Sequence, residues 1–214
     1  MRLLSELFSN NRAWAAGVEQ RSPGFFSTLA NQQSPEYFWI GCADSRVPAN
    51  EIVGLMPGEV FVHRNVANVV NPFDLNCVAC LEYAVNVLQV KHIMVVGHYG
   101  CGGVRAVLDG EYRGKVGEWL GPVRGVAQKY GARLGEGEQA RWKRLCELNV
   151  VEQAAAAWES TVVREAWARG QHIGVHGWIY AVGDGLLKDL DVTVASSAEA
   201  DGIRRLAIEK ILAD

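Results

Sequence analysis

The sequence has few of the features that mark membrane, secreted or nucleic-acid-binding proteins. No apolar stretch approaches the roughly 20 residues that span a bilayer. The first residues, MRLLSELFSNNRAWAAG, mix acids and polar residues at helical spacing, unlike the basic and then apolar segments of a signal peptide. The formal charge is only −3 and there is no basic run, which argues against a nucleic-acid partner. We therefore expect a cytoplasmic protein that binds neither nucleic acid nor membrane.

Cysteine is also scarce, with five residues in the chain. An odd number disfavours a disulfide framework. Cys77 and Cys80 form a CxxC pair, but they lie within an apolar pattern of helical spacing over residues 74–90. Because a free cysteine packs as a small hydrophobe, we interpret this pair and Cys146 as helix packing, in preference to a redox or metal site.

At 214 residues, without repeats, low-complexity tracts or linkers, the chain is expected to form a single domain over residues 1–214. Within it, residues 1–35 read as a helical arm. Strands are expected over residues 37–41, 58–63, 92–97, 173–180 and 186–190, the last two joined by a turn at 183–185, and a long helix over 145–168. Strands that alternate with helices predict an α/β fold with a mainly parallel central sheet, flanked by helices, and an antiparallel edge hairpin.

Two short clusters follow predicted strands, namely CADSR at 42–46 and HYGCGG at 98–103. In a parallel sheet, ligands gather where strands end and helices begin, so Cys42, His98 and Cys101 can meet at one rim if the two strands are neighbours. Two cysteines and one histidine hold zinc and leave its fourth position open. Zn²⁺ suits this sulfur and nitrogen donor set better than Mg²⁺ or Ca²⁺ does.

Asp44 and Arg46 are expected on the same side of an extended segment, which gives the Asp44 carboxylate two possible partners. It can bind zinc as the fourth ligand, or it can pair with the fork of Arg46 and leave that position to a water that zinc activates. Two thiolates cancel the metal charge, so activity should rise with pH. Two alternatives are a structural zinc closed by Asp44, and core cysteines beside a satisfied histidine.

The sequence resembles the β-class carbonic anhydrases. The residues that carry the resemblance are CADSR at 42–46, VFVHRNVAN at 60–68, Tyr83, GHYGCGG at 97–103 and GQHIGVHGWIYAVGDG at 170–185. The resemblance implies reversible hydration of CO2 to bicarbonate and a proton by a hydroxide on zinc, with the metal held by Cys42, His98 and Cys101. It also implies that Asp44 and Arg46 are the catalytic pair that gates the fourth zinc position.

The same resemblance implies a substrate pocket and a quaternary structure. The implied pocket residues are Gln33, Phe61, Val66, Tyr83 and Gly102, some of them supplied by a neighbouring subunit. The family forms dimers or tetramers in which N-terminal helices embrace the partner, a role that fits residues 3–19. Without the family, Phe61, Val66 and Tyr83 read as ordinary core.

A bacterial-type, bicarbonate-regulated subgroup of the family is similar to this chain in having Trp39, Arg64 and Tyr180 together. The resemblance implies that these residues bind bicarbonate away from zinc and favour the closed state, in which Asp44 ligates the metal. We then expect little activity below about pH 8, because deprotonation favours opening. Alternatively, Trp39 and Tyr180 belong to the sheet core and Arg64 pairs with an acid.

Two other functions remain open at this point. The same scaffold can hydrolyse a CO2-like molecule such as carbon disulfide, and residue types at the site do not distinguish the two substrates. A non-catalytic protein that binds zinc and anions, closed permanently by Asp44, is the second alternative.

Overall fold

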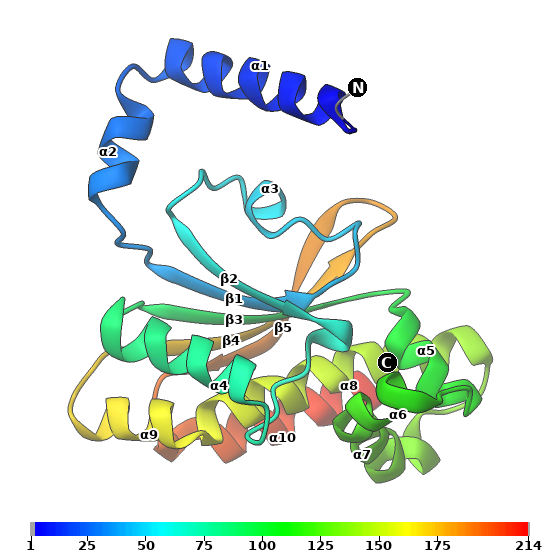
Figure 1. Ribbon diagram of the computed structural model, residues 1–214. Coiled ribbons are helices and arrows are strands. Elements are labelled where there is room, and N and C mark those ends of the chain that lie inside the picture. Colours follow the sequence, from blue (N-terminus) through cyan, green and yellow to red (C-terminus); the bar gives the residue numbers. More distant parts are fainter. Residues whose placement is uncertain (1–2, 214) are drawn as a thin grey trace. The chain divides into compact units, whose positions relative to one another are not determined.

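A computed structural model of the protein describes residues 3–213 (Figure 1). The chain divides into two compact units, the first ending at Ser34 and the second beginning at Pro35. The N-terminal unit contains α1 (Ser5–Arg21) and α2 (Phe25–Asn31). Trp14 and Phe26 join these helices edge to face, with ring centroids 5.6 Å apart. The expected N-terminal helices are therefore present, and their packing on a partner subunit stays a prediction.

The larger unit is built on a five-stranded sheet with the strand order β2-β1-β3-β4-β5. The strands are β1 (Tyr37–Cys42), β2 (Val60–Asn65), β3 (His92–His98), β4 (Gly174–Ala181) and β5 (Leu186–Val194). The first four run parallel, and β5 pairs antiparallel with β4. This confirms the predicted α/β fold with a mainly parallel sheet and an antiparallel edge hairpin.

Helices cover the two faces of this sheet unequally (Figure 1). One face carries α4 (Leu75–Glu82), α5 (Gly102–Asp109), α8 (Glu138–Glu159), α9 (Thr161–Ala168) and α10 (Ser197–Ala213). The other face of the unit carries the short α3 (Ala49–Val53). β1 and β3 are buried along almost their whole length, which explains why they read as near-continuous apolar runs and not as alternating patterns.

The long helix α8 approaches the central strand β3 closely at Gly97. A Cβ added at Gly97 would lie 2.5 Å from Val150 Cγ2 and 3.2 Å from Asn68 Oδ1. The absence of a side chain at Gly97 therefore lets α8 pack directly against the strand that ends at His98.

Several boundaries differ from the sequence-based expectations. The helix expected over 145–168 begins at Glu138 and is interrupted at Ser160, whose hydroxyl accepts a hydrogen bond from Val163 N and caps α9. β2 starts two residues late, and the helix α4 ends in a π-helical turn, η2 (Tyr83–Val87). Between α5 and α8 lie α6 (Gly114–Trp119), α7 (Gly121–Tyr130) and η3 (Gly131–Arg133). Within residues 3–213, no helix has the length and apolar character needed to cross a membrane.

Candidate metal centre

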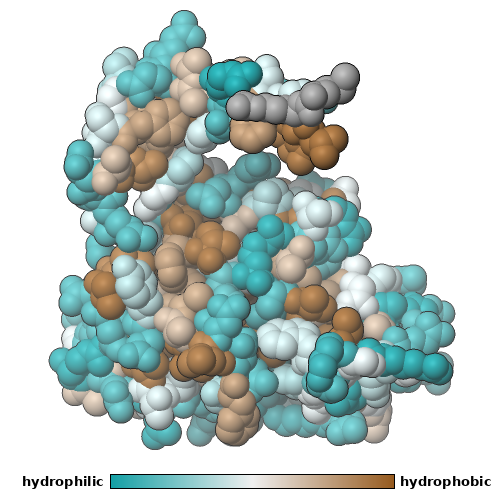
Figure 2. All heavy atoms as spheres, in the orientation of Figure 1, coloured by the Kyte–Doolittle hydropathy of each residue, from teal (hydrophilic) through white to brown (hydrophobic). Residues whose placement is uncertain are grey.

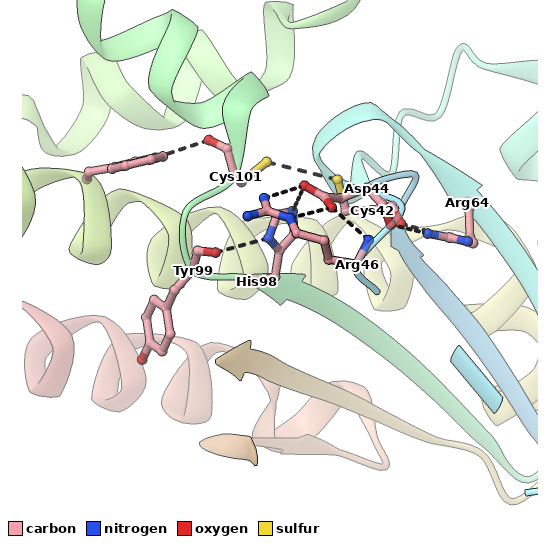
Figure 3. Close-up of polar contacts among 8 residues, drawn as sticks. Cys42, Asp44, Arg46, Arg64, His98, Tyr99 and Cys101 are labelled. Atoms are coloured by element: carbon pink, nitrogen blue, oxygen red, sulfur yellow. Dashed lines mark hydrogen bonds and ion pairs between the residues drawn. The ribbon is translucent and has the colours of Figure 1, made fainter. Parts of the chain in front are cut away.

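Cys42, His98 and Cys101 come together at the carboxyl ends of two neighbouring parallel strands. Cys42 ends β1, His98 ends β3, and Cys101 directly precedes α5. The two sulfur atoms are 4.0 Å apart, and one ligand atom from each of the three side chains lies within 4.8 Å of the others (Figure 3). All three side chains are buried.

The hydrogen bond of one ring nitrogen leaves the other nitrogen of His98 free to bind a metal. Nδ1 lies 3.0 Å from the carbonyl oxygen of Tyr99. A carbonyl only accepts, so Nδ1 carries the proton and Nε2 carries a lone pair. Nε2 is buried without a hydrogen-bond partner among the described residues. A buried polar atom without a partner is costly, and a Zn²⁺ ion between this nitrogen and two thiolates removes that cost. The residues therefore fit zinc.

A second cluster of donors, His63, Asp74 and Cys77, fits a metal less well. The Asn65 amide is oriented by Val69, because its Oδ1 accepts from Val69 N at 2.7 Å and its Nδ2 donates to Val69 O at 2.8 Å. The other N–H of that amide faces His63 Nε2 at 3.1 Å, which occupies the nitrogen lone pair. Burial raises the pKa of the Cys77 thiol to about 12. This cluster therefore lacks the free nitrogen and the accessible thiolate of the first.

The protein by itself stabilises one thiolate at the first cluster. A hydrogen bond from Cys101 lowers the pKa of Cys42. The Cys42 thiolate in turn raises the pKa of Cys101, and so does burial. Because cysteines bind a metal as thiolates, metal binding should release a proton from this pair.

Asp44 and Arg46 form a bidentate ion pair beside the donors (Figure 3). Arg46 Nε donates to Asp44 Oδ1 at 2.9 Å, and Nη2 donates to Oδ2 at 2.7 Å. Arg46 N also donates to Oδ1 at 2.9 Å, so the segment is an Asx turn and the expected extended conformation is wrong. The Arg46 hydrogen bonds hold the pKa of Asp44 well below its usual range. Asp44 Oδ2 is nevertheless only 3.7 Å from His98 Nε2, so this carboxylate borders the position that a metal would take.

The five residues expected to line a substrate pocket lie in three places: Val66 and Gly102 together, Phe61 and Tyr83 together, and Gln33 by itself. Val66 lies beside the start of α5, which begins at Gly102, because its Cγ1 would be 3.1 Å from a Cβ added at Gly103. Phe61 packs against Tyr83 with ring centroids 5.8 Å apart.

Phe61 precedes Asn65, the β2 partner of Cys42, by four residues, which puts it about 13 Å along the strand from the donors. The Phe61–Tyr83 pair therefore lies away from the metal ligands of its own chain. Gln33 is an exposed residue of the N-terminal unit.

Trp39, Arg64 and Tyr180 all project from the same face of the sheet, because they share one parity in the strand register. Trp39 is fully buried, and its Nε1 has no acceptor among residues 3–213. Arg64 donates to the carbonyl oxygens of Cys42, at 2.9 Å, and of Asp44. The hydrogen bonds of this guanidinium therefore go to backbone carbonyls and not to an acid, the partner considered as an alternative.

Sequence reasoning missed the residues that support the donors from α8. Trp142 Nε1 donates to Cys101 O at 3.1 Å, and the Tyr99 hydroxyl donates to the buried Glu147 carboxylate. Trp142 lies in a stretch of sequence without any motif, so no local signal identified it.

Comparisons with known proteins agree with this geometry. The family model for carbonic anhydrase matches residues 37–187. A carbonic anhydrase from Emericella nidulans is 48% identical over 189 residues, covering 87% of this chain and 83% of that protein. A Coccomyxa β-carbonic anhydrase structure superposes with a TM-score of 0.92 at 41% identity, covering 98% of this chain and 96% of that one. A tetrameric β-carbonic anhydrase from Sordaria macrospora gives a TM-score of 0.84 at 42% identity, covering 89% and 98%. This protein therefore belongs to the β-carbonic anhydrases, the family of enzymes that hydrate CO2.

Proposed function

We propose that the protein catalyses the reversible hydration of CO2 to bicarbonate and a proton, with Zn²⁺ bound by Cys42, His98 and Cys101. The observation that carries the proposal is the buried donor cluster in which His98 Nε2 has a lone pair and no partner. β-Carbonic anhydrases are zinc enzymes, and membership of that family supports CO2 as the substrate.

The side chains around the donors have distinct tasks. When bound, zinc supplies Lewis-acid activation of water, which two thiolate ligands weaken relative to three imidazoles, so activity should increase with pH. Arg46 holds the Asp44 carboxylate, and Asp44 is the group placed to accept a hydrogen bond from a reactant beside His98. Val66 offers an apolar wall next to the α5 N-terminus, which suits CO2 because this molecule is small and apolar.

We further infer that Asp44 gates the site by exchanging partners. Its carboxylate is bonded to Arg46 and lies 3.7 Å from His98 Nε2, so a small rotation changes its neighbour. The Arg46 side chain is 52% exposed, so water can solvate the guanidinium when Asp44 leaves it. The carboxylate can then occupy the fourth metal position.

For the regulatory site, the proposal is that bicarbonate binds between Trp39, Arg64 and Tyr180. The unpartnered, buried Trp39 Nε1 supports it, because an anion would accept that hydrogen bond. Arg64 supplies positive charge, and its bonds to the carbonyls of Cys42 and Asp44 connect such an anion to the gate.

Self-association completes the proposal. Phe61 and Tyr83 lie away from the donors of their own chain, so they can line the pocket only if a second copy supplies them. Apolar side chains exposed on β2, on the loop that follows it and on the next two helices support such a contact, namely Val62, Val66, Phe73, Leu75 and Val87. Figure 2 shows hydrophobic patches among hydrophilic side chains on the face of the larger unit where β2 and α4 lie.

The test is stopped-flow CO2 hydration by zinc-loaded protein between pH 6.5 and 9.5, with zinc measured per chain. We expect one zinc per chain and a steep rise in rate above about pH 8. A Cys101→Ser variant should lose both zinc and activity. Zinc binding without hydration at any pH would refute the carbonic anhydrase assignment. A rate as high at pH 7 as at pH 9 would refute the gate alone.

A further inference from the structure

A strained turn lies next to the metal donors, between β2 and α4. Ala67 and Asn68 are consecutive residues with positive φ, at 65° and 47°. This left-handed conformation brings Cβ too close to the following carbonyl, so residues other than glycine avoid it. Asparagine tolerates it better than alanine does. Ala67 is fully buried, and strained backbone persists only where its surroundings hold it in place.

The turn is held by two buried amides of α8. Asn149, only 1% exposed, donates from Nδ2 to Ala67 O at 3.0 Å. One helical turn later, Gln153 Nε2 donates to Asn149 Oδ1 at 3.1 Å, and Gln153 Oε1 accepts from Val70 N at 2.8 Å. These bonds fix the orientation of both amides, so the N–H of Asn149 must face the Ala67 carbonyl.

The left-handed turn lies beside the segments that carry Cys42 and Cys101. It follows Asn65, whose carbonyl oxygen accepts a hydrogen bond at 2.8 Å from the backbone N–H of Ala43, the neighbour of Cys42. On its other side, the Ala67 methyl would be 3.2 Å from a Cβ added at Gly103, at the start of the helix that follows Cys101. Hydrogen bonds from groups around the ligands orient those ligands and tune the metal. A change in the left-handed turn would therefore shift the groups that pack against both cysteine segments.

We propose that Asn149 is a positioning residue of the metal centre, which holds the Ala67–Asn68 turn in place beside the two segments that carry Cys42 and Cys101. Asn149 acts through Ala67 and touches neither metal nor substrate. The inference rests on the proposed zinc site, and it assigns to α8 a role in metal binding as well as in the core.

The first test compares the wild type with Asn149→Leu, which keeps a similar volume and removes the amide. Zinc affinity is measured by chelator competition, the ligand field by the visible spectrum of the Co²⁺ form, and folding by thermal melting. We expect zinc affinity to fall about tenfold or more, as for loss of other groups around metal ligands, with an altered cobalt–thiolate absorption. The matched control is Val163→Ala in α9, also fully buried, which should lower the melting temperature and leave zinc affinity unchanged.

Rescue distinguishes positioning from simple packing. Glycine adopts φ near 65° without a Cβ penalty, so Ala67→Gly should restore zinc affinity in the Asn149→Leu background. If Asn149 only fills the core, Ala67→Gly removes a second buried methyl and cannot restore it. Should Asn149→Leu not fold, Asn149→Ala replaces it in both measurements.

Wild-type affinity and spectrum in the Asn149 variants, or no rescue by glycine, would overturn the inference. A wild-type protein that binds no zinc would instead overturn the proposed function and this inference with it.

Discussion

Two buried histidines show how a single hydrogen bond decides which imidazole can bind a metal. His98 donates from Nδ1 to a carbonyl and leaves Nε2 free, whereas the Nε2 of His63 accepts from the Asn65 amide. Both histidines lie near a cysteine and an aspartate. The residue types are therefore alike at the two clusters, and the hydrogen-bond partners distinguish them.

At Arg46, the fork that holds Asp44 can be tested directly. Arg46→Ala frees the carboxylate for the fourth metal position, so we expect zinc to stay bound while CO2 hydration falls by about two orders of magnitude or more. Arg46→Lys keeps the charge without the bidentate geometry, so its hydration rate should lie between those of Arg46→Ala and the wild type. Zinc content and stopped-flow rates check this, and an Arg46→Ala enzyme with wild-type turnover would contradict the gate.

At Trp39, the prediction concerns inhibition by bicarbonate. A Cβ added at Gly41 would lie 2.1 Å from Trp39 Nε1, so the indole lies directly over a glycine. Trp39→Phe removes the N–H and keeps an aromatic ring. Because a hydrogen bond to a charged group contributes about 1.5–3 kcal/mol, inhibition should weaken roughly 10- to 100-fold. Trp158→Phe, at another buried tryptophan, is the control. Equal inhibition constants for Trp39→Phe and the wild type would show that Trp39 packs in the sheet core and does not bind bicarbonate.

Among the elements, the contact between α8 and β3 depends on Gly97. Gly97→Ala places a methyl 2.5 Å from Val150 Cγ2, and such overpacking costs about 1–3 kcal/mol of unfolding free energy. Val150→Ala makes room, so the double variant should lose less than the sum of the two single losses, with a coupling of about 0.5–3 kcal/mol. Urea unfolding measures the stability of the two single variants and of the double variant.

The control for this cycle is the same substitution in open space. A Cβ at Gly125 of α7 meets nothing within 4 Å, so Gly125→Ala should stabilise by about 0.5–1 kcal/mol. Additive losses in the double variant would show that the close approach at Gly97 does not limit stability.

For the whole molecule, we expect self-association through the side that carries β2 and α4. Phe73 is 94% exposed there, and Phe73→Glu would place a charge in the interface, with a cost of several kcal/mol if it is buried unpaired. Sedimentation should then show smaller species and CO2 hydration should fall, because Phe61 and Tyr83 would no longer reach a second chain. Leu206→Glu, on α10 and 67% exposed, is the matched control. An unchanged sedimentation profile for Phe73→Glu would exclude this side as the interface.

The fold class and the identity of the donors follow from the order of residues along the chain. Apolar runs that alternate with helical patterns specify a parallel sheet, because strands buried on both faces must be apolar throughout. Cys42, His98 and Cys101 each lie within three residues of a strand end. The sequence therefore predicts that they meet if the two strands are neighbours, and the strand order shows that they are. The Asp44–Arg46 pair was one of two partners predicted for this carboxylate, since a contact between residues two apart is local. The cytoplasmic location stays a prediction.

Tertiary structure alone decided which groups complete the site. The hydrogen bonds from Trp142 to Cys101 O and from Asn149 to Ala67 O depend on side-chain directions, and they join residues 41 and 82 positions apart. The interruption of the long helix at Ser160 and the distance of Phe61 from the donors were decided there too. Local propensity specifies strands and helices, but it does not specify how closely a helix approaches a sheet. That distance depends on the side-chain volumes of several elements at once. Here it depends on the absence of a side chain at Gly97.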